Sequence, residues 1–253
     1  MIIQSIDRAS QILGLFSLNR STLGVTEIAR SLNLNKSTVQ GLVRALVHIG
    51  FLQRDPETRK YQLGPRIYEL GTILAGSLDI NQKSSQPADR LAKKIELLVR
   101  IAILDGDSAL ITLDAYPRSQ PFIFRQFGLR APLYCTAVGK ALLAYSDPKT
   151  VDEYLRQTEF VAYTPTTLTN KEDLMKELEL TRKRGYSVNR EEHFLSRVAI
   201  GAPIFAREGR LAGSMCISGP PERILGDDHE KLVQEIKNTS LEITRHMGHF
   251  SEG

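Results

Sequence analysis

Apolar residues in the first 50 positions recur at three- and four-residue spacing, the period of one face of an α-helix. The first predicted helix follows Ser5, a favourable N-cap, and ends near Asn19. Its inward face is formed by Ile6, Ala9, Leu13 and Phe16. The chain is therefore expected to begin its fold with a short amphipathic helix.

Two more short helices follow, separated by the turn LNLN. Thr26 is a favourable N-cap for the helix TEIARSL, and Asn35 for the helix KSTVQGLVRALVH. Gly50 is placed to end the third helix. Its inward stripe consists of Val39, Leu42, Val43, Leu46 and Val47. Two helices joined by such a turn form a helix-turn-helix, which fits the major groove of DNA.

The outward face of the third helix carries groups suited to DNA. Gln40 and Arg44 lie four residues apart and can pair with adenine and guanine edges. Lys36, Ser37 and Thr38 lie in the first turn, where a helix approaches phosphate. Taken alone, the same face also fits an ordinary solvated helix surface.

Two strand-like runs, FLQR and KYQL, flank DPET, where Pro56 suits the second position of a type I turn. Arg54, Arg59 and Lys60 gather near the tip of this hairpin, in reach of phosphate or the minor groove. Three helices and a basic hairpin together predict a winged helix-turn-helix.

A linking helix is predicted over 64–78, where Gly71 and Gly76 permit close approach of another helix. One side carries Ile67, Leu70, Leu74 and Leu78. This stripe is suited to pairing with its copy in a second chain, which would place two recognition helices on a palindromic site. The alternative is that the stripe packs on its own chain.

The remaining residues alternate between helical and strand-like patterns. Helices are predicted near 88–98 and over 136–145, 147–155, 171–185 and 227–247. Strands are predicted over 100–106, 108–116, 121–127, 198–205 and 211–217. The pattern predicts an α+β chain whose C-terminal part is an α/β sensor with a mostly antiparallel sheet.

Composition changes this picture little, but charge sharpens it. The 253 residues are 42% hydrophobic and 25% charged, which excludes a mainly disordered chain. Residues 1–78 hold nine Lys or Arg against five Asp or Glu, whereas residues 79–253 hold 24 of each. All the net charge of +4 therefore lies in the N-terminal third, as expected where a polyanion binds. Uneven surface charge is the simpler alternative.

No segment indicates a membrane or secretory protein. The longest runs without Asp, Glu, Lys or Arg are 11 residues, too short for a membrane span of about 20. The start, MIIQSIDR, lacks the pattern of a signal peptide, so a cytoplasmic protein is expected.

Enzyme motifs are missing from the sequence. It contains no GxSxG, HExxH, GxxxxGK[ST] or GxGxxG, and its cysteines, Cys135 and Cys216, form no CxxC or Cys/His cluster. Glu191, Glu192 and His193 are adjacent, so in a strand they point to opposite faces. We expect no catalytic residue, cofactor or metal. The alternative kept open is a small-molecule-binding enzyme with an accessory DNA-binding-like domain.

An ordered set of motifs resembles the IclR family of bacterial transcription regulators. The N-terminal motifs are SIDRASQIL, VTEIARSLNLNKSTVQGLVRAL, GFLQRD and YQLGPRIYELG. LYCTAVGKALLA, TRKRGYSVNREEH and ISGPPERI follow in the family's order. The resemblance implies a DNA-binding domain over 1–63, a linking helix over 64–78, and a GAF-like effector-binding and oligomerisation domain over 79–253. It also implies a DNA-binding regulator of catabolic genes that assembles as dimers or dimers of dimers. A repressor and an activator need the same contacts, so the sequence leaves that choice open.

The resemblance places a small organic-acid effector at Ala137, Val138, Asn189, Ala199, Cys216 and Ser218. Small residues at Ala137, Ala199, Gly201 and Gly213 are expected to leave room for it. The family's small-oxoacid sensors have Asp, Cys and Ser where this chain has Asn189, Ala199 and Cys216. A larger, partly apolar or aromatic carboxylate is therefore the expected effector.

Overall fold

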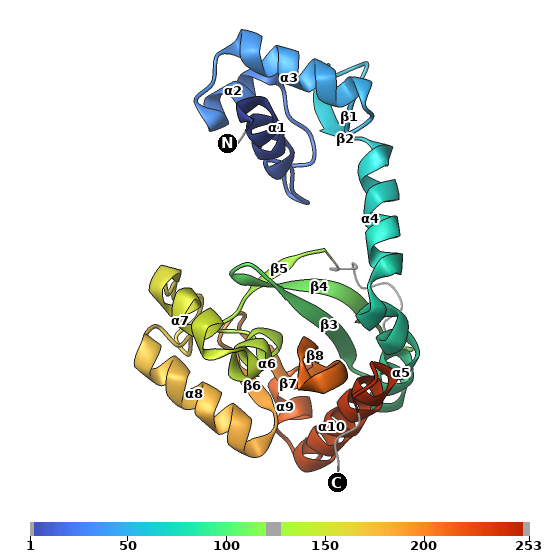
Figure 1. Cartoon of the computed structure of the whole chain (residues 1–253), viewed down its shortest axis with the longest axis vertical. Coiled ribbons are helices and arrows are strands. Elements are labelled where there is room, and N and C mark those ends of the chain that lie inside the picture. Colours follow the sequence, from blue (N-terminus) through green and yellow to red (C-terminus); the bar gives the residue numbers. More distant parts are fainter. Residues whose placement is uncertain (1–2, 120–127, 250–253) are drawn as a thin grey trace. The chain divides into compact units, whose positions relative to one another are not determined.

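The chain forms two compact units, Met1–Ser77 and Leu78–Gly253, in a computed structural model that describes residues 3–119 and 128–249 (Figure 1). Each unit has its own hydrophobic core. Within these described ranges, no helix is both long and apolar enough to span a bilayer.

The N-terminal unit is a winged helix-turn-helix, as predicted. Its elements are α1 (Gln4–Gly14), α2 (Val25–Leu32), α3 (Lys36–His48), β1 (Leu52–Arg54), β2 (Tyr61–Leu63) and α4 (Pro65–Ser77). Ile12, Ile28 and Val43 are fully buried among the first three helices. Leu23 and Tyr61 exchange two backbone hydrogen bonds of 2.8 Å, which tie β2 to the chain ahead of α2.

Two predicted N-caps are wrong. Ser5 lies inside α1, which begins at Gln4, and Ile6 is 65% exposed; the helix ends at Gly14, before Asn19. Thr26 lies inside α2, whose N-cap is Gly24. The Gly24 N–H donates to the carboxylate of Glu27 at 2.6 Å, which is the half of a capping box that the acid three residues along supplies.

The ends of α2 and α3 explain the tight turn. Asn33 ends α2 in the left-handed region at φ 51°, which an asparagine tolerates. Asn35 stands at the N-cap of α3, but its side chain makes no capping hydrogen bond. Gly50 has φ 77° and closes α3 as predicted: its N–H donates to Val47 and the next N–H to Leu46.

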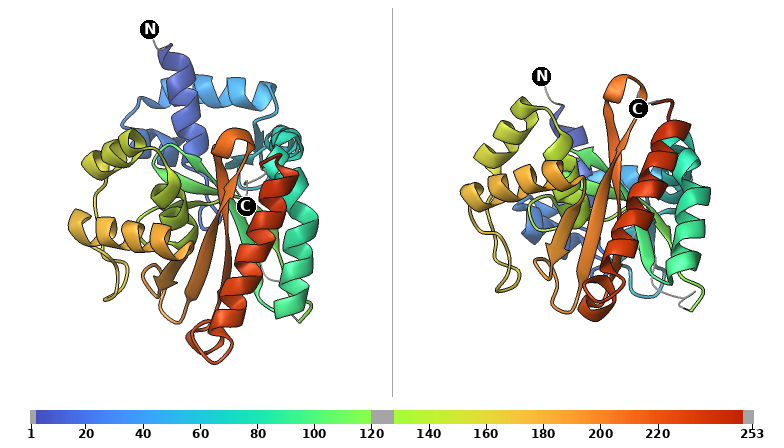
Figure 2. Two further views of the ribbon diagram at one scale, coloured as in Figure 1. Left: turned by 60° about the horizontal axis from the view of Figure 1, so that its bottom comes forward. Right: turned by 90° about the horizontal axis from the view of Figure 1, so that it is seen from below.

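The C-terminal unit is one six-stranded antiparallel sheet covered by helices on both faces (Figure 2). Its strands are β3 (Leu98–Asp105), β4 (Ser108–Ala115), β5 (Arg130–Pro132), β6 (Ser187–Arg190), β7 (Val198–Phe205) and β8 (Leu211–Gly219). Their order in the sheet is β5-β4-β3-β8-β7-β6. The predicted antiparallel sheet is therefore confirmed for the described strands.

Helices divide the unit into two cores. α5 (Asp79–Ile95) and α10 (His229–His246) lie side by side on one face of the sheet, with the short α9 (Pro221–Ile224) beside them. α6 (Ala137–Tyr145), α7 (Pro148–Gln157) and α8 (Lys171–Arg184) lie on the other face, and η1 (Arg207–Gly209) joins β7 to β8.

Two predicted elements near the sheet differ from the structure. The helix expected near 88–98 is α5, which begins nine residues earlier at Asp79, and Leu98 already belongs to β3. α5 accommodates Pro87 and buries Ile80 and Ala88 against the sheet. The strand predicted over 121–127 lies outside the described residues.

Candidate functional site

The outer face of α3 is polar and free of the core. Lys36, Ser37, Gln40 and Arg44 are exposed and Thr38 is half-buried, while Val39 and Val43 on the opposite face are fully buried. Among the described residues, no ion pair engages Lys36 or Arg44. The helix is thus anchored on one side and leaves the predicted DNA-contacting side chains available on the other.

The wing is a closed hairpin with its basic groups outside. The Asp55 carboxylate accepts the N–H groups of Glu57 and Thr58, both at 2.8 Å, and the Arg59 N–H donates to the Asp55 carbonyl. These N–H groups hold the pKa of Asp55 below its usual value. The hydrogen bond from the Arg59 N–H to the Asp55 carbonyl closes the turn, and Arg59 itself has φ 57°.

The three predicted wing residues have different surroundings. Arg59 is exposed, and Arg54 lies over the ring of Tyr61, with 5.8 Å between the guanidinium carbon and the ring centroid. Lys60 forms an ion pair of 3.4 Å with Glu27 of α2. The ion pair joins the wing to the helix-turn-helix and leaves Lys60 about half exposed.

Gly41 is a position that the sequence reading missed. It lies inside α3, on the exposed side with Ser37 and Arg44, and a Cβ built there would meet nothing within 4 Å. A glycine inside a helix costs about 1 kcal/mol relative to alanine. Since packing within the chain does not require this glycine, the position fits a surface that something else approaches closely.

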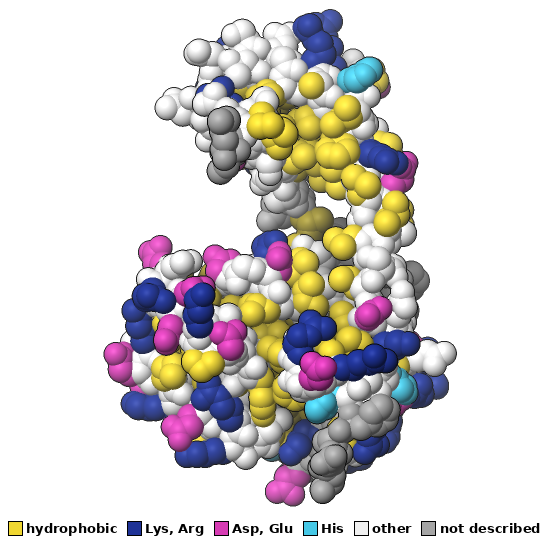
Figure 3. Space-filling model, in the orientation of Figure 1, with side chains coloured by type: hydrophobic (Ala, Val, Ile, Leu, Met, Phe, Trp, Pro, Cys, Tyr) yellow, Lys and Arg dark blue, Asp and Glu magenta, His cyan; other side chains and the backbone are white. Residues whose placement is uncertain are grey.

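The linking helix α4 buries none of its residues. Tyr68, Ile73 and Leu74 are each more than half exposed, and Figure 3 shows hydrophobic side chains along this helix. Leu78, the last residue of the predicted stripe, lies beyond the end of α4 and is the N-cap of α5.

The structure gathers the six predicted effector residues on one face of the sheet, beside the first turn of α6. Asn189, Ala199 and Ser218 lie in register across β6, β7 and β8. Cys216 lies in the next row, and Ala137 and Val138 start α6 in the same core cluster. All six are buried except Ser218, which is half-buried.

Hydrogen bonds that the sequence reading missed hold α6 on this face. Ser187 Oγ donates to the Ala137 carbonyl at 2.6 Å, and Ser214 Oγ to the Val138 carbonyl at 3.0 Å. The expectation that Gly201 and Gly213 leave room for a ligand is wrong. A Cβ at Gly201 would lie 2.6 Å from the Ala137 carbonyl oxygen, and one at Gly213 would strike the carbonyl of Ala102. Both glycines permit close packing.

A fixed orientation distinguishes Asn189. Its Oδ1 accepts the Glu192 N–H at 2.8 Å, and this donor assigns the oxygen and nitrogen of the amide. Its Nδ2 makes no hydrogen bond with any described residue. Thr136 caps α6 by accepting the Gly139 N–H at 3.1 Å. Asn189 therefore offers a donor beside the start of α6.

Arg100 and Asp114 are further charged groups in this region that the sequence reading missed. Arg100 pairs in register with Cys216 on one side and Asp114 on the other, so all three side chains share one face. Arg100 Nε donates to Asp114 at 3.2 Å, and the Tyr116 hydroxyl donates to the same carboxylate at 2.9 Å. Only the alternation of strand residues, once the strands were paired, could have located them.

The candidate catalytic groups are engaged in packing. Burial raises the pKa of Cys135 to about 12, with a smaller contribution from the Glu192 charge, and raises that of Cys216 to about 12. Glu192 pairs with Lys140, and burial lowers the pKa of His193, whose ring packs on Tyr163. These surroundings suit core residues.

Comparison with known proteins agrees with this architecture. Residues 5–56 match the IclR helix-turn-helix domain, and residues 73–245 match the bacterial transcriptional regulator IclR C-terminal domain. The chain is 29% identical over 248 residues to the HTH-type transcriptional regulator XynR of Escherichia coli, covering 98% of both chains. It is 31% identical to the glycerol operon regulatory protein of Streptomyces coelicolor, covering 97% of both.

Solved structures share the whole fold. An IclR transcriptional regulator from Alicyclobacillus acidocaldarius superposes with a TM-score of 0.85 at 26% identity, over 98% of this chain and 100% of that one. An IclR homolog from Microbacterium hydrocarbonoxydans, complexed with 4-hydroxybenzoate, superposes with a TM-score of 0.82 at 22% identity, over 96% of this chain and 99% of that one. A winged helix-turn-helix followed by a matching C-terminal sensor fold, along nearly the entire chain, makes this protein a member of the IclR family of bacterial transcriptional regulators.

Proposed function

We propose that this protein binds a palindromic operator through two copies of its winged helix-turn-helix. Binding of a small organic acid then lowers or raises its affinity for that operator. The observation that carries the proposal is the outer face of α3, where Gln40 and Arg44 are exposed over a fully buried apolar face. A regulator of this kind acts in the cytoplasm, where its DNA is.

The proposed DNA contacts divide by chemistry. Gln40 and Arg44 read base edges, because amide and guanidinium groups form paired hydrogen bonds with adenine and guanine. Phosphates are contacted by Lys36, Ser37 and Thr38 at the start of α3. Arg54, Arg59 and Lys60 place the wing on the adjacent backbone or minor groove.

Self-association through α4 completes the DNA-binding form. The helix exposes Tyr68, Ile73 and Leu74, and exposed apolar groups gathered on one helix are typical of a protein contact. Two copies joined there present two recognition helices to half-sites about one helical turn, roughly 34 Å, apart. The C-terminal units join such dimers into dimers of dimers.

The proposed effector is an organic acid, and its pocket contains Ala137, Val138, Asn189, Ala199, Cys216 and Ser218. Support comes from polarity: Asn189 presents Nδ2 as a donor, and the first N–H groups of α6 favour negative charge. Ala199 and Cys216 make the remaining wall apolar, which suits an aromatic carboxylate. The neighbour solved with 4-hydroxybenzoate makes that compound a rational first probe.

Fluorescence anisotropy with DNA from upstream of the protein's own gene tests the proposal, at two salt concentrations and with nonspecific competitor. Arg44→Ala should weaken specific binding by about 5- to 150-fold, the loss of one base-reading side chain. Lys60→Ala should weaken all DNA binding and flatten the salt dependence by about one counterion. Lys149→Ala, in the C-terminal unit with a side chain 84% exposed, is the control. Unchanged affinity in both test variants would refute the assignment.

A further inference from the structure

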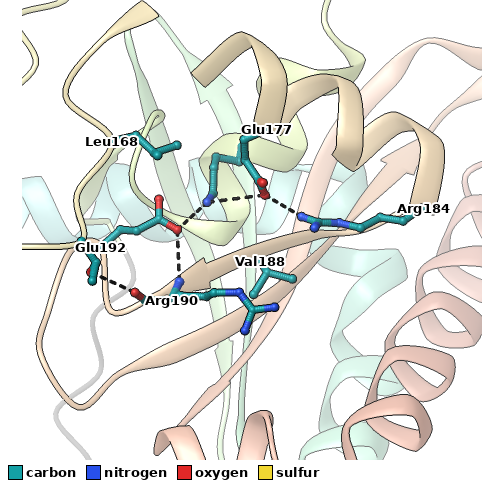
Figure 4. Close-up of a pocket in the computed structure, with 8 residues that line it drawn as sticks. Leu168, Glu177, Arg184, Val188, Arg190 and Glu192 are labelled. Atoms are coloured by element: carbon teal, nitrogen blue, oxygen red, sulfur yellow. Dashed lines mark hydrogen bonds and ion pairs between the residues drawn. The ribbon is translucent and has the colours of Figure 1, made fainter. Parts of the chain in front are cut away.

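A second pocket, of about 270 Å³, lies beside the edge strand β6 and between α6, α8 and the loop ahead of α8 (Figure 4). It is lined by Lys140, Thr166, Leu168, Glu177, Arg184, Val188, Arg190 and Glu192. None of the six predicted effector residues lines it, so it is a separate place on the C-terminal unit.

A buried ion-pair network forms one wall of this pocket. The side chains of Lys140 and Glu192 are 1% and 7% exposed and form an ion pair of 2.6 Å. Glu177 lies 3.7 Å from Lys140 and 2.5 Å from Arg184. The charges of Lys140, Glu177 and Arg184 are therefore already compensated within the chain.

One cationic side chain and one carboxylate oxygen in the same pocket remain without a partner among the described residues. Glu192 Oε1 accepts from Lys140 Nζ and from the Arg190 N–H, but Glu192 Oε2 is buried and has no hydrogen-bond partner in the described part of the chain. Figure 4 shows this free oxygen directed toward Leu168. The Arg190 guanidinium is exposed and makes no hydrogen bond or ion pair with any described residue. A buried carboxylate oxygen without a donor is unfavourable, so the pocket calls for one from outside the chain.

We propose that this pocket binds a small carboxylate that also carries a hydrogen-bond donor, an amino acid or a hydroxy acid. Its ammonium or hydroxyl group donates to Glu192 Oε2, and its carboxylate pairs with Arg190. The volume is below the roughly 300–1,000 Å³ of common ligand pockets, which limits the occupant to a few heavy atoms. An anion alone satisfies only Arg190, and a cation alone only Glu192.

Glu192 also connects this pocket to the proposed effector pocket, and this part of the inference rests on the proposed function. Glu192 holds the Asn189 side chain through its N–H, and Lys140 lies one turn after Ala137 on α6. A molecule bound to Glu192 stabilises the arrangement that orients Asn189 as a donor. By linkage, the two ligands then change each other's affinity by the same factor.

Isothermal titration calorimetry of the full-length protein with glycine, L-serine and glycolate tests the site. Acetate, which lacks the donor group, and ethylamine, which lacks the carboxylate, are the control probes. We expect at least one of glycine, L-serine and glycolate to bind ten or more times tighter than both control probes. Arg190→Gln should weaken that probe at least tenfold, whereas Arg156→Gln, an exposed arginine of α7 outside the pocket, should leave its affinity unchanged. Tighter binding of glycine or of glycolate distinguishes an amino acid from a hydroxy acid.

Glu192→Gln keeps an acceptor for Lys140 but offers an amide donor in place of Oε2, so it should also lose the probe. If that variant fails to fold by circular dichroism, Arg190→Gln carries the test alone. The proposal is overturned if none of glycine, L-serine and glycolate binds, if acetate or ethylamine binds as tightly, if Arg190→Gln has no effect, or if a crystal soaked with the tightest-binding probe shows only water at Glu192. Operator binding without probe is measured in parallel, so failure of the DNA-binding proposal is seen separately.

Discussion

The buried Lys140–Glu192 ion pair should stabilise the C-terminal unit strongly, so removal of one partner is a sharp test. Lys140→Met keeps the length and apolar stem of the side chain but removes the charge 2.6 Å from Glu192. The Glu192 carboxylate, 7% exposed, would keep only the Arg190 N–H as a donor. Breaking a buried pair on one side costs about 3–5 kcal/mol, because one charge stays buried without its partner.

Urea and thermal unfolding of the full-length protein measure this cost. For a unit of this size, each kcal/mol of lost stability lowers the Tm by about 2–4 °C, so the Tm of the C-terminal unit should fall by about 6–20 °C. Lys183→Met is the matched control on α8, where the ion pair with Glu179 is 70% and 61% exposed. An exposed i,i+4 pair contributes about 0.3–0.5 kcal/mol, so this control should barely move the transition.

A double-mutant cycle separates the pair from the packing around it. Replacing both partners, Lys140→Met with Glu192→Leu, leaves no buried unpaired charge and should recover most of the lost stability. Our account of this pair is refuted if the free energies of unfolding lost in Lys140→Met and in Lys183→Met differ by less than about 1 kcal/mol. It is also refuted if the loss in the double mutant equals the sum of the losses in the two single mutants.

Further predictions concern glycines and thiols. Gly41→Ala should raise the stability of the N-terminal unit by about 1 kcal/mol and weaken operator binding, because the helix gains propensity while the exposed face gains bulk; unchanged DNA affinity would remove Gly41 from the interface. Gly201→Ala should cost about 1–3 kcal/mol in chemical denaturation, because its Cβ would lie 2.5 Å from Ser187 Oγ. Cys135 and Cys216, with pKa values of about 12, should react with a thiol reagent at pH 8 only after unfolding, and rapid labelling of the folded protein would contradict their burial.

Local patterns in the sequence determined most of the N-terminal unit. The helix-turn-helix, the wing and the end of α3 at Gly50 follow from apolar spacing, turn residues and one glycine that needs φ 77°. Helix starts were less well predicted. Ser5 and Thr26 are good capping residues by type, but burial of Ile12 and Ile28 and the bond between Gly24 and Glu27 place the starts elsewhere.

The beginning of α5 was missed because its own residues argue against a helix. Ile80 is the only large apolar residue between positions 79 and 86, and Pro87, which follows, cannot donate a helical hydrogen bond. Packing of Ile80 and Ala88 against the sheet stabilises the helix all the same. Propensity is a weak guide where tertiary burial is this extensive.

The chemistry of the C-terminal unit depended on contacts between distant segments. Lys140 and Glu192 lie 52 residues apart in the sequence, and only folding brings them together in the buried interior. Strand pairing aligned Arg100 with Cys216, and packing of α6 showed that Gly201 serves close approach rather than ligand space. The sequence by itself determined which elements form, since their signals are local, whereas the pairing of charges and the orientation of Asn189 were decided by the tertiary structure, because they arise from groups that meet only on folding.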